Sequence, residues 1–291
     1  MSASYRVMGI VNVTPDSFSD GGSFLDPDAA IAHACSLAAH GADILDVGGE
    51  STRPGAEPVS AEEELRRVLP VLEGIAGAGV DAQLSIDTSK ASVARAAIAA
   101  GARIVNDVSA LRADPGMAEL IAESGAHCCL MHMLDEPRTM QRAGAGGPQY
   151  KDVVDDVKAF LEQRLEFAVR AGVREQRIML DPGIGFGKTT AHNLTLIERL
   201  GELTALGRPL VVGTSRKTFI GRIAADLAGE TEPLAPALRL PGTIATNVLA
   251  LERGASVFRV HDVAPVRDAL AVAAATLSGR WTARAGTTQT S

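Results

Sequence analysis

The chain has 291 residues, which is enough for one large α/β domain or two smaller ones. Its net charge is −7, it has no long basic run, and no apolar stretch approaches the roughly 18 residues needed to cross a membrane. The sequence therefore predicts neither a nucleic-acid partner nor a membrane partner. Its three cysteines (Cys35, Cys128 and Cys129) are odd in number and include an adjacent pair, which indicates reduced thiols. Together with the lack of an export signal, this predicts a cytoplasmic protein.

Short runs rich in β-branched residues recur along the whole chain and predict buried strands. They occupy residues 6–13, 42–49, 83–88, 102–109, 127–132, 178–183, 210–215 and 257–263. Alanine- and leucine-rich stretches with helical spacing lie between them, for example at 27–42, 90–102 and 153–173. Several of these stretches finish at glycine, which commonly ends a helix.

Eight strand and helix units in one chain predict an α/β protein with a (β/α)8 TIM barrel fold rather than an open sheet. No linker divides the chain, so we expect a single barrel domain over residues 1–280. Residues 216–255 form a longer crossover with several prolines and predict one barrel unit with an extra helix or loop. The polar tail, residues 281–291, is predicted to be disordered.

Polar side chains stand at the end of nearly every predicted strand, where barrel enzymes place their active sites. They are Asn12, Asp46, Glu50, Asp87, Asn106, Asp107, His132, Asp181, Ser215 to Lys217, Arg259 and His261. Each Asp, Asn or Ser could instead cap a helix or form a turn. Capping does not call for lysine, arginine and histidine at the same rim, so we expect a binding site there.

This rim offers two kinds of chemistry. Asp87, Asn106 and Asp181 can exchange hydrogen bonds with the edge of an amino-pyrimidine ring, and Lys217 can donate to a ring oxygen or nitrogen. Three further side chains suit an anion such as phosphate: Arg53, Arg259 and His261. A substrate with a polar ring and a phosphate-like group would satisfy both sets.

Three features of the sequence allow more than one interpretation. Asn12 supplies one oxygen ligand, so a Mg²⁺ ion shared with phosphate oxygens fits better than a closed protein cage, and there is no zinc pattern. His132 suits packing or a supporting contact better than a metal or nucleophile site. The glycine spacing of "DPGIGFGKT" is not that of a phosphate-binding P-loop, and Phe186 within it could contact an aromatic substrate or pack in the core.

The chain resembles the bacterial dihydropteroate synthases from about residue 6 to residue 278. Eight motifs carry this resemblance, in the order found in that family: "MGIVNVTPDSFSDGG", "DILDVGGESTRPGA", "SIDTSK", "IVNDVSA", "LMHM", "LDPGIGFGK", "GTSRKTFIG" and "RVHDV". The resemblance implies a (β/α)8 barrel that condenses 6-hydroxymethyl-7,8-dihydropterin pyrophosphate with para-aminobenzoate. The products would be 7,8-dihydropteroate, an intermediate of folate synthesis, and pyrophosphate.

The resemblance also implies a role for individual residues. Asp87, Asn106 and Asp181 would bind the pterin edge, Lys217 its carbonyl side, and Met131 a ring face. Asn12 would ligate Mg²⁺. The pyrophosphate would be held by Arg53, Arg259 and His261, and the aminobenzoate pocket would be lined by Thr52, Pro54, Phe186 and Thr218. Position 218 is commonly serine in the family, and the threonine methyl could narrow this pocket.

The implied catalytic residues are Asp87, Asp181 and Lys217, around a pterin cation that forms when pyrophosphate leaves. The loop from Thr14 to Gly22 would close over the site as a lid. The family suggests a homodimer, and its members are targets of sulfonamides. Two alternatives stay open from the sequence: a pterin-dependent methyltransferase domain, and a non-catalytic paralogue that binds pterin or a protein partner.

Overall fold

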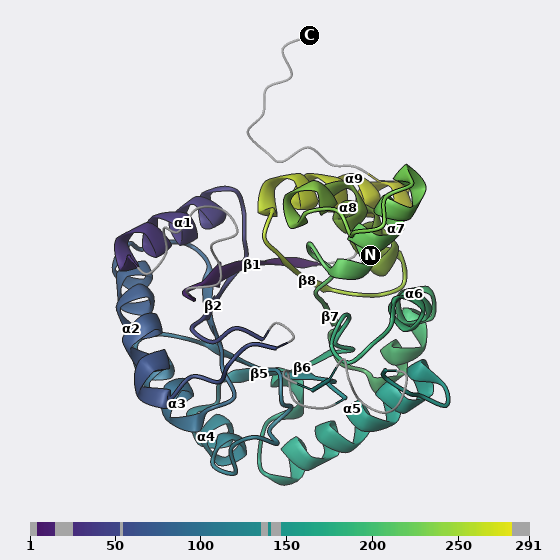
Figure 1. The fold of residues 1–291 in the computed structure, drawn as a ribbon. Helices are drawn as coiled ribbons and strands as arrows, with labels where there is room; N and C mark the ends of the chain where they lie inside the picture. The colour runs from purple at the N-terminus through teal and green to yellow at the C-terminus, as the bar shows by residue number, and fades with distance from the viewer. Residues whose placement is uncertain (1–4, 15–25, 53–54, 135–138, 141–146, 281–291) are drawn as a thin grey trace.

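Eight strands form one parallel sheet in the order β6-β5-β4-β3-β2-β1-β8-β7 within the described part of the chain. The structure is a computed structural model that describes residues 5–14, 26–52, 55–134, 139–140 and 147–280. The strands are β1 (Arg6–Asn12), β2 (Ile44–Gly48), β3 (Gln83–Asp87), β4 (Ile104–Asp107), β5 (His127–Met131), β6 (Ile178–Asp181), β7 (Val211–Val212) and β8 (Val257–Val260). Figure 1 shows the strands as a ring with the helices around its outside. The predicted TIM barrel is confirmed.

The ring closes between β6 and β7 through a short contact. Leu180 and Leu210 form an isolated parallel bridge, and the Leu180 N–H donates to the Pro209 carbonyl at 3.0 Å. Proline has no N–H to extend the ladder. The predicted strand over residues 210–215 is shorter in the structure, where β7 comprises only Val211 and Val212.

The helices alternate with the strands. They are α1 (Pro27–Ala39), α2 (Ala61–Gly77), α3 (Ala91–Ala99), α4 (Met117–Ser124), α5 (Val153–Arg170), α6 (Thr190–Glu198), α7 (Thr218–Ala228), α8 (Leu240–Glu252) and α9 (Val263–Ser278), with 3₁₀ turns η2 (Glu175–Arg177), η3 (Leu200–Leu206) and η4 (Pro236–Arg239). Between β7 and β8 the chain forms α7, η4 and α8, which confirms the extra element predicted for residues 216–255. No helix in the described ranges is long and apolar enough to span a lipid bilayer.

Local sequence explains where several helices begin. The Ser60 hydroxyl accepts from the Glu63 N–H at the start of α2, and three glutamates follow in its first turn. Thr189 and His192 form a reciprocal capping box at the start of α6. These caps satisfy N–H groups that have no partner within the helix.

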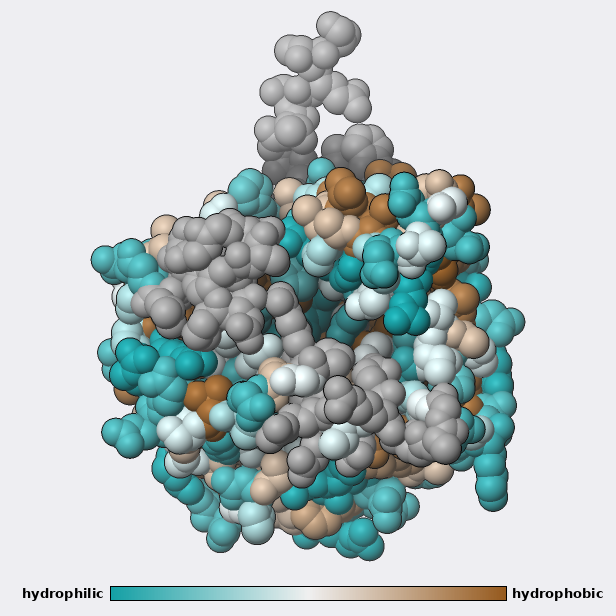
Figure 2. Space-filling model, viewed as in Figure 1, coloured by the Kyte–Doolittle hydropathy of each residue, from teal (hydrophilic) through white to brown (hydrophobic). Residues whose placement is uncertain are grey.

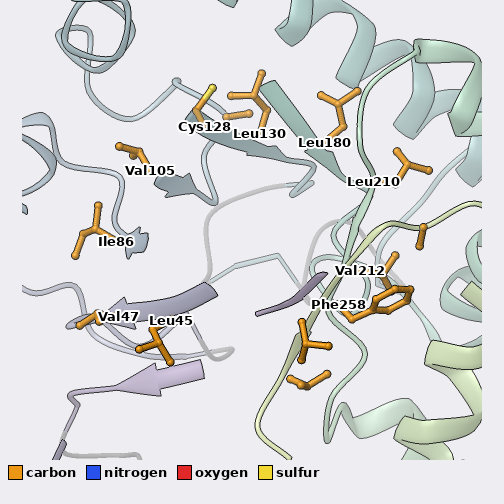
Figure 3. Packing of buried hydrophobic residues seen from close by; sticks show 14 of the residues in the cluster. Leu45, Val47, Ile86, Val105, Cys128, Leu130, Leu180, Leu210, Val212 and Phe258 are labelled. Atoms are coloured by element: carbon orange, nitrogen blue, oxygen red, sulfur yellow. The ribbon is translucent and has the colours of Figure 1, made fainter. Parts of the chain in front are cut away.

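Side chains alternate between two cores because successive residues of a strand face opposite sides. One set points outward and packs against the helices, as Figure 3 shows for Leu45, Val105, Leu130, Val212 and Phe258. The other set fills the inside of the barrel with Met8, Ile44, Ile104, Cys129, Met179, Val211 and Val257. The three cysteines are free thiols, as predicted.

Candidate active site

The apolar side chains that fill the inside of the barrel, from Met8 to Val257, are called the plug residues below. The polar site lies directly beyond them, toward the carboxyl ends of the strands. Two residues further along each strand face the same side, so Asp46, Asn106, Met131, Asp181 and Arg259 follow the plug residues of their own strands. The sheet register places Asp87 beside Asn106, and Met131 beside Asp181. Side chains from separate motifs are thereby gathered at the carboxyl ends of the strands.

Asp46 is the centre of the hydrogen-bond network in this site. Its side chain is completely buried and accepts from the Ser85 hydroxyl at 2.5 Å, the Asn106 amide at 3.0 Å and the Arg259 Nε at 2.7 Å. A carboxylate can only accept, so the Asn106 Nδ2 faces Asp46 and its Oδ1 is left to face a ligand. The sequence indicates only that Asp46 lies at a strand end, and it does not predict that this carboxylate accepts from three side chains.

Arg259 joins two carboxylates across the barrel. Its Nη2 donates to Asp87 Oδ2 at 2.7 Å, while its Nε donates to Asp46. Burial and the neighbouring Asp46 raise the pKa of Asp87 to about 7, against the lowering effect of Arg259. Burial alone would lower the pKa of Arg259, but the two carboxylates raise it above its ordinary value. The guanidinium therefore stays charged and holds both acids in place.

Asp181, at the end of β6, and Lys217, at the start of α7, influence each other electrostatically. The Asp181 Oδ1 accepts from the Gly183 N–H at 2.6 Å, and burial raises the pKa of this carboxyl. Lys217 places its Nζ 4.0 Å from the centre of the Phe186 ring. Burial, together with Arg259, lowers the pKa of Lys217 to about 8, although Asp181 and Asp87 oppose this shift. The lysine is a cation held close to its point of deprotonation.

His261 follows β8 and is bound to the loop after β7. Its ring Nδ1 lies 2.9 Å from the Ser215 Oγ, and its backbone N–H donates to the same oxygen at 3.1 Å. Burial lowers the pKa of His261 to about 3, with further lowering by Arg216 and Arg259. The ring is thus neutral near pH 7 while no anion is bound.

Comparison with known proteins identifies this arrangement. The family model for pterin binding enzymes matches residues 8–261. The chain belongs to the pterin-binding enzyme family. It is 45% identical over 275 residues to the dihydropteroate synthase of Escherichia coli K12, which covers 94% of this chain and 93% of the relative.

Solved structures agree with this assignment. The Xanthomonas albilineans dihydropteroate synthase with 4-aminobenzoic acid has 47% sequence identity and a TM-score of 0.83, covering 94% of each chain. The same enzyme in complex with 7,8-dihydropteroate aligns with 44% identity and a TM-score of 0.80, over 96% of this chain and 95% of that one. Within the pterin-binding family, the chain thus falls among the dihydropteroate synthases, which confirms the resemblance seen in the motifs.

The remaining predicted site residues of this pterin-binding protein are spread around the same end of the barrel. Asn12 ends β1 and is half-buried, Met131 is buried at the end of β5, and Thr52 is half-buried in the loop after β2. Thr218 is the first residue of α7 and is exposed. Arg53, Pro54 and the lid residues 15–22 lie outside the described residues.

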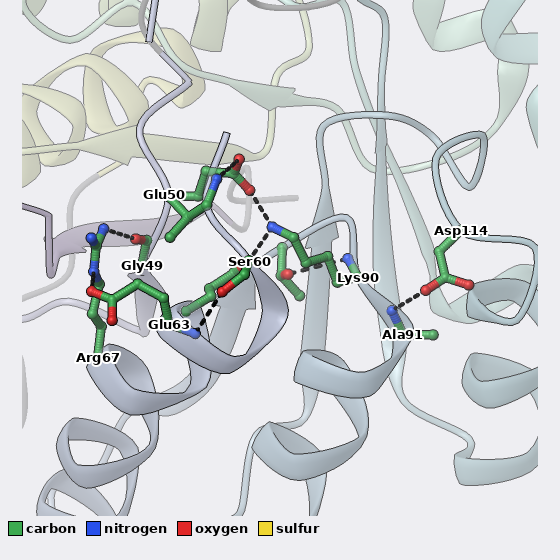
Figure 4. Close-up of polar contacts among 11 residues, drawn as sticks. Gly49, Glu50, Ser60, Glu63, Arg67, Lys90, Ala91 and Asp114 are labelled. Carbon is green, nitrogen blue, oxygen red and sulfur yellow. Dashed lines mark hydrogen bonds and ion pairs between the residues drawn. The ribbon is translucent and has the colours of Figure 1, made fainter. Parts of the chain in front are cut away.

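The loop that carries Thr52 is anchored by a cluster of charges that the sequence did not predict. Figure 4 shows Lys90, at the start of α3, bound to the carboxylate of Glu50, which follows β2. The ammonium of Lys90 also lies near the start of α2. Its second carboxylate partner is Glu64, whose side chain is completely buried. The Glu50 Oε1 also accepts from the Val59 N–H at 3.1 Å, at the far end of the loop. Lys90 thus ties both ends of this loop to the barrel.

The metal prediction can be compared with the donor atoms present. The described residues contain no group of three or more His, Cys, Asp or Glu side chains placed to hold a metal ion. Asn12 supplies a single amide oxygen at the strand end. This donor set suits a hard cation that takes most of its ligands from phosphate oxygens and water.

Proposed function

We propose that the polar network of this site binds 6-hydroxymethyl-7,8-dihydropterin pyrophosphate and para-aminobenzoate and condenses them to 7,8-dihydropteroate and pyrophosphate. The observation that carries this proposal is the Asp46 network, which holds an amide, a carboxylate and a guanidinium at one rim. The full-length likeness to dihydropteroate synthases, including complexes with 4-aminobenzoic acid and 7,8-dihydropteroate, supports the same reaction.

The pterin ring would lie among the acceptors inside the barrel. Asp181 has one oxygen on Gly183, which leaves the other for the amino-pyrimidine edge, and Asn106 offers its Oδ1. Asp87 completes this edge, and Lys217 would donate to the ring carbonyl. Met131, beside Asp181 in the register, would pack on a ring face.

The pyrophosphate would bind beside Arg259. Only two N–H groups of this guanidinium are used by Asp46 and Asp87, so others remain to donate to phosphate oxygens. His261 is neutral without an anion and would take up a proton beside one. Arg53 is proposed to act on the same group. Asn12 would hold Mg²⁺, which, when bound, supplies a Lewis acid that stabilises negative charge on the leaving group.

The chemistry consists of one bond broken and one formed at one carbon atom. The bond between the exocyclic methylene carbon and the pyrophosphate oxygen breaks, and its electron pair leaves with the oxygen. Asp87 and Asp181 would stabilise the pterin cation, and Arg259 and His261 the leaving anion. The aryl amine nitrogen then forms a bond to the methylene carbon, and one of its N–H bonds breaks as the proton passes to the released pyrophosphate or to water. A strong base is not required, because the amine is already a free base at neutral pH.

The aryl amine would enter between two loops. Phe186 and Thr218 lie beside Lys217 on one side, and Thr52 with Pro54 would form the other. Thr218 keeps the hydroxyl of the serine usual at this position, and its exposed side chain could donate to the aminobenzoate carboxylate.

We also propose that the chain forms a homodimer in the cytoplasm. Among the described residues, five large apolar side chains are exposed on α7, η4 and α9: Ile223, Leu227, Leu238, Val272 and Leu277. Figure 2 shows hydrophobic surface in this region, where α8 packs on both α7 and α9. A contiguous apolar surface favours burial against another molecule. Light scattering should give twice the chain mass of 30.2 kDa, and Val272→Glu with Leu227→Glu should give a monomer.

A direct assay tests the proposed reaction. Purified chain, Mg²⁺ and both substrates should release pyrophosphate and form dihydropteroate in equal amounts. Omitting para-aminobenzoate should abolish dihydropteroate formation. A non-catalytic paralogue would bind the pterin and form no product, and a methyltransferase domain would show no dependence on the aryl amine.

A further inference from the structure

A buried pair of basic side chains, Lys188 and His132, lies behind the site and has no part in the proposed reaction. Lys188 is only 3% exposed and His132 5%. The lysine Nζ is 2.9 Å from the His132 Nδ1 and donates to the Phe186 carbonyl at 3.0 Å. None of the described carboxylates forms an ion pair with this lysine, which is unusual for a buried ammonium and requires an explanation.

The charge states of the two groups fit each other. When Lys188 is an ammonium it has three donors and no acceptor, so the His132 Nδ1 accepts and the ring proton is on Nε2. Burial and the adjacent Lys188 lower the pKa of His132 to about 2, which keeps the ring neutral. Burial lowers the pKa of Lys188 to about 7, while Asp181 acts to raise it.

His132 itself is fixed firmly. Its backbone N–H donates to the backbone carbonyl of Asp181 at 2.9 Å. Its ring packs edge-on against Phe160 of α5, with the two ring centroids 4.8 Å apart. The loop after β6 also lies directly on its backbone. Gly183 has φ +67°, and a Cβ there would lie 1.8 Å from the His132 carbonyl oxygen. Lys188 is therefore bound to a rigid point at the end of β5.

The loop that Lys188 holds carries Phe186. The Phe186 ring lies 4.0 Å from Lys217 Nζ, within the predicted aminobenzoate pocket. Other side chains bind this loop away from Phe186: Asn193 accepts from the Gly185 N–H at 2.7 Å, and Tyr150 donates to the Gly187 carbonyl at 2.8 Å. Among the described residues, Lys188 is the charged side chain that binds the Phe186 carbonyl, which is the contact nearest to the ring.

We propose that Lys188, fixed by His132, is a positioning residue for the aminobenzoate side of the site. It holds the Phe186 backbone so that the ring stays against Lys217. The pterin side depends on Asp181 and the Asp46 network instead. The proposal rests on the proposed function, and it assigns Lys188 an effect on one substrate and not on the other.

Steady-state kinetics of the full chain test this assignment. Lys188→Met keeps the unbranched apolar part of the side chain and removes the ammonium group with its donors. We expect the KM for para-aminobenzoate to rise about tenfold or more, as for a lost charge-assisted hydrogen bond, while the KM for dihydropterin pyrophosphate changes by less than about threefold. An unchanged KM for para-aminobenzoate, or equal changes in both, would overturn the proposal.

A matched pair of variants covers the case in which Lys188→Met fails to fold. His132→Asn keeps an acceptor for the ammonium and should retain the wild-type KM for para-aminobenzoate. His132→Leu removes it and should behave as Lys188→Met does. Equal effects of the two His132 variants would contradict the proposal. Tyr150→Phe, which removes a neutral bond to the same loop, should have a smaller effect.

Hydrogen exchange separates this proposal from the proposed function. The backbone amides of residues 183–187 should exchange faster in the Lys188→Met or His132→Leu variant than in wild type, with no substrate present. Wild-type chain that makes no dihydropteroate would refute the proposed reaction alone. Unchanged exchange in these variants would refute the positioning role alone.

Discussion

Asn106 donates its side-chain amide to the buried carboxylate of Asp46 at 3.0 Å, across 60 residues of sequence. The contact fixes the orientation of an amide that could otherwise present either a donor or an acceptor to the ligand. Because Asp46 also accepts from Arg259, one carboxylate orients a residue of the pterin side and a residue of the pyrophosphate side. The two halves of the site are thereby built on a single side chain.

Asp46→Asn should weaken binding of both a pterin and pyrophosphate. The substituted amide can no longer accept from three donors at once, so Asn106 is free to turn over and Arg259 loses a charged partner. A hydrogen bond to a charged group contributes about 1.5–3 kcal/mol, or roughly a ten- to hundredfold change in each dissociation constant. Calorimetric titration with each ligand measures this. Ser85→Ala, which removes one neutral donor, serves as the control and should cost less.

Asp181→Asn should weaken pterin binding and catalysis together. The new side chain can keep its oxygen on the Gly183 N–H, which turns its NH2 group toward a ring edge that needs an acceptor. We expect a loss of about 1.5–3 kcal/mol in pterin binding by calorimetry. Asp114→Asn, at a carboxylate that binds the start of α3, is a control outside the site. Wild-type pterin affinity in Asp181→Asn would show that this residue does not contact the ring.

Lys90→Met should destabilise the fold. It leaves Glu50 and the completely buried Glu64 without their shared cation, and the other oxygen of Glu64 already has no partner among the described residues. Breaking a buried ion pair costs about 3 kcal/mol or more. Urea unfolding should show this loss, and Glu50→Gln, at the more exposed acid, should show a smaller one. A change below about 0.5 kcal/mol would mean that the cluster contributes little.

The pH dependence of stability should report on His132. Its pKa is about 2 in the folded chain and lies near 6.5 in an unfolded one, so below pH 6.5 the unfolded state binds a proton that the folded state does not. Its contribution to stability is therefore present above pH 6.5 and is lost as the pH falls. The raised pKa of Asp87 acts in the opposite direction, so the comparison must be made between variants.

His132→Asn isolates this contribution. Between pH 6 and 4 the free energy of unfolding of the wild type should fall relative to that of the variant by up to about 1.4 kcal/mol per pH unit. Chemical denaturation at several pH values measures the difference. Parallel curves for the two proteins would show that His132 has the same pKa in both states.

Para-aminobenzoate should bind weakly to the free chain and more tightly with Mg²⁺ and pyrophosphate present. Thr52 lies on a loop tied to the barrel by Glu50 and Lys90, and the predicted lid, residues 14–22, is rich in glycine and small polar residues. An anion beside Arg259 should draw these loops over the second pocket, and the coupling must be reciprocal. Equal affinities in calorimetric titrations with and without Mg²⁺ and pyrophosphate would exclude a pocket completed in this way.

The sequence was sufficient to predict the barrel. Eight apolar runs with polar residues at their ends, separated by helical stretches, leave few other ways to bury the strands on both faces. The strand-end position of Asp87, Asn106, Asp181 and Arg259 was predictable for the same reason, since parallel strands bring their carboxyl ends to one rim. The family was also visible, because eight ordered motifs carry more information than any one of them.

Contacts between these side chains were decided only by tertiary structure. Arg259 meets Asp46 across 213 residues of sequence, and Lys188 meets His132 across 56. No local pattern encodes such a pair, because its geometry depends on how the sheet closes and on which strands become neighbours. In the closed sheet β7 is two residues long, although its sequence predicts a longer strand. The local sequence thus determined which side chains reach the rim, and the closed barrel determined which of them form ion pairs and hydrogen bonds with one another.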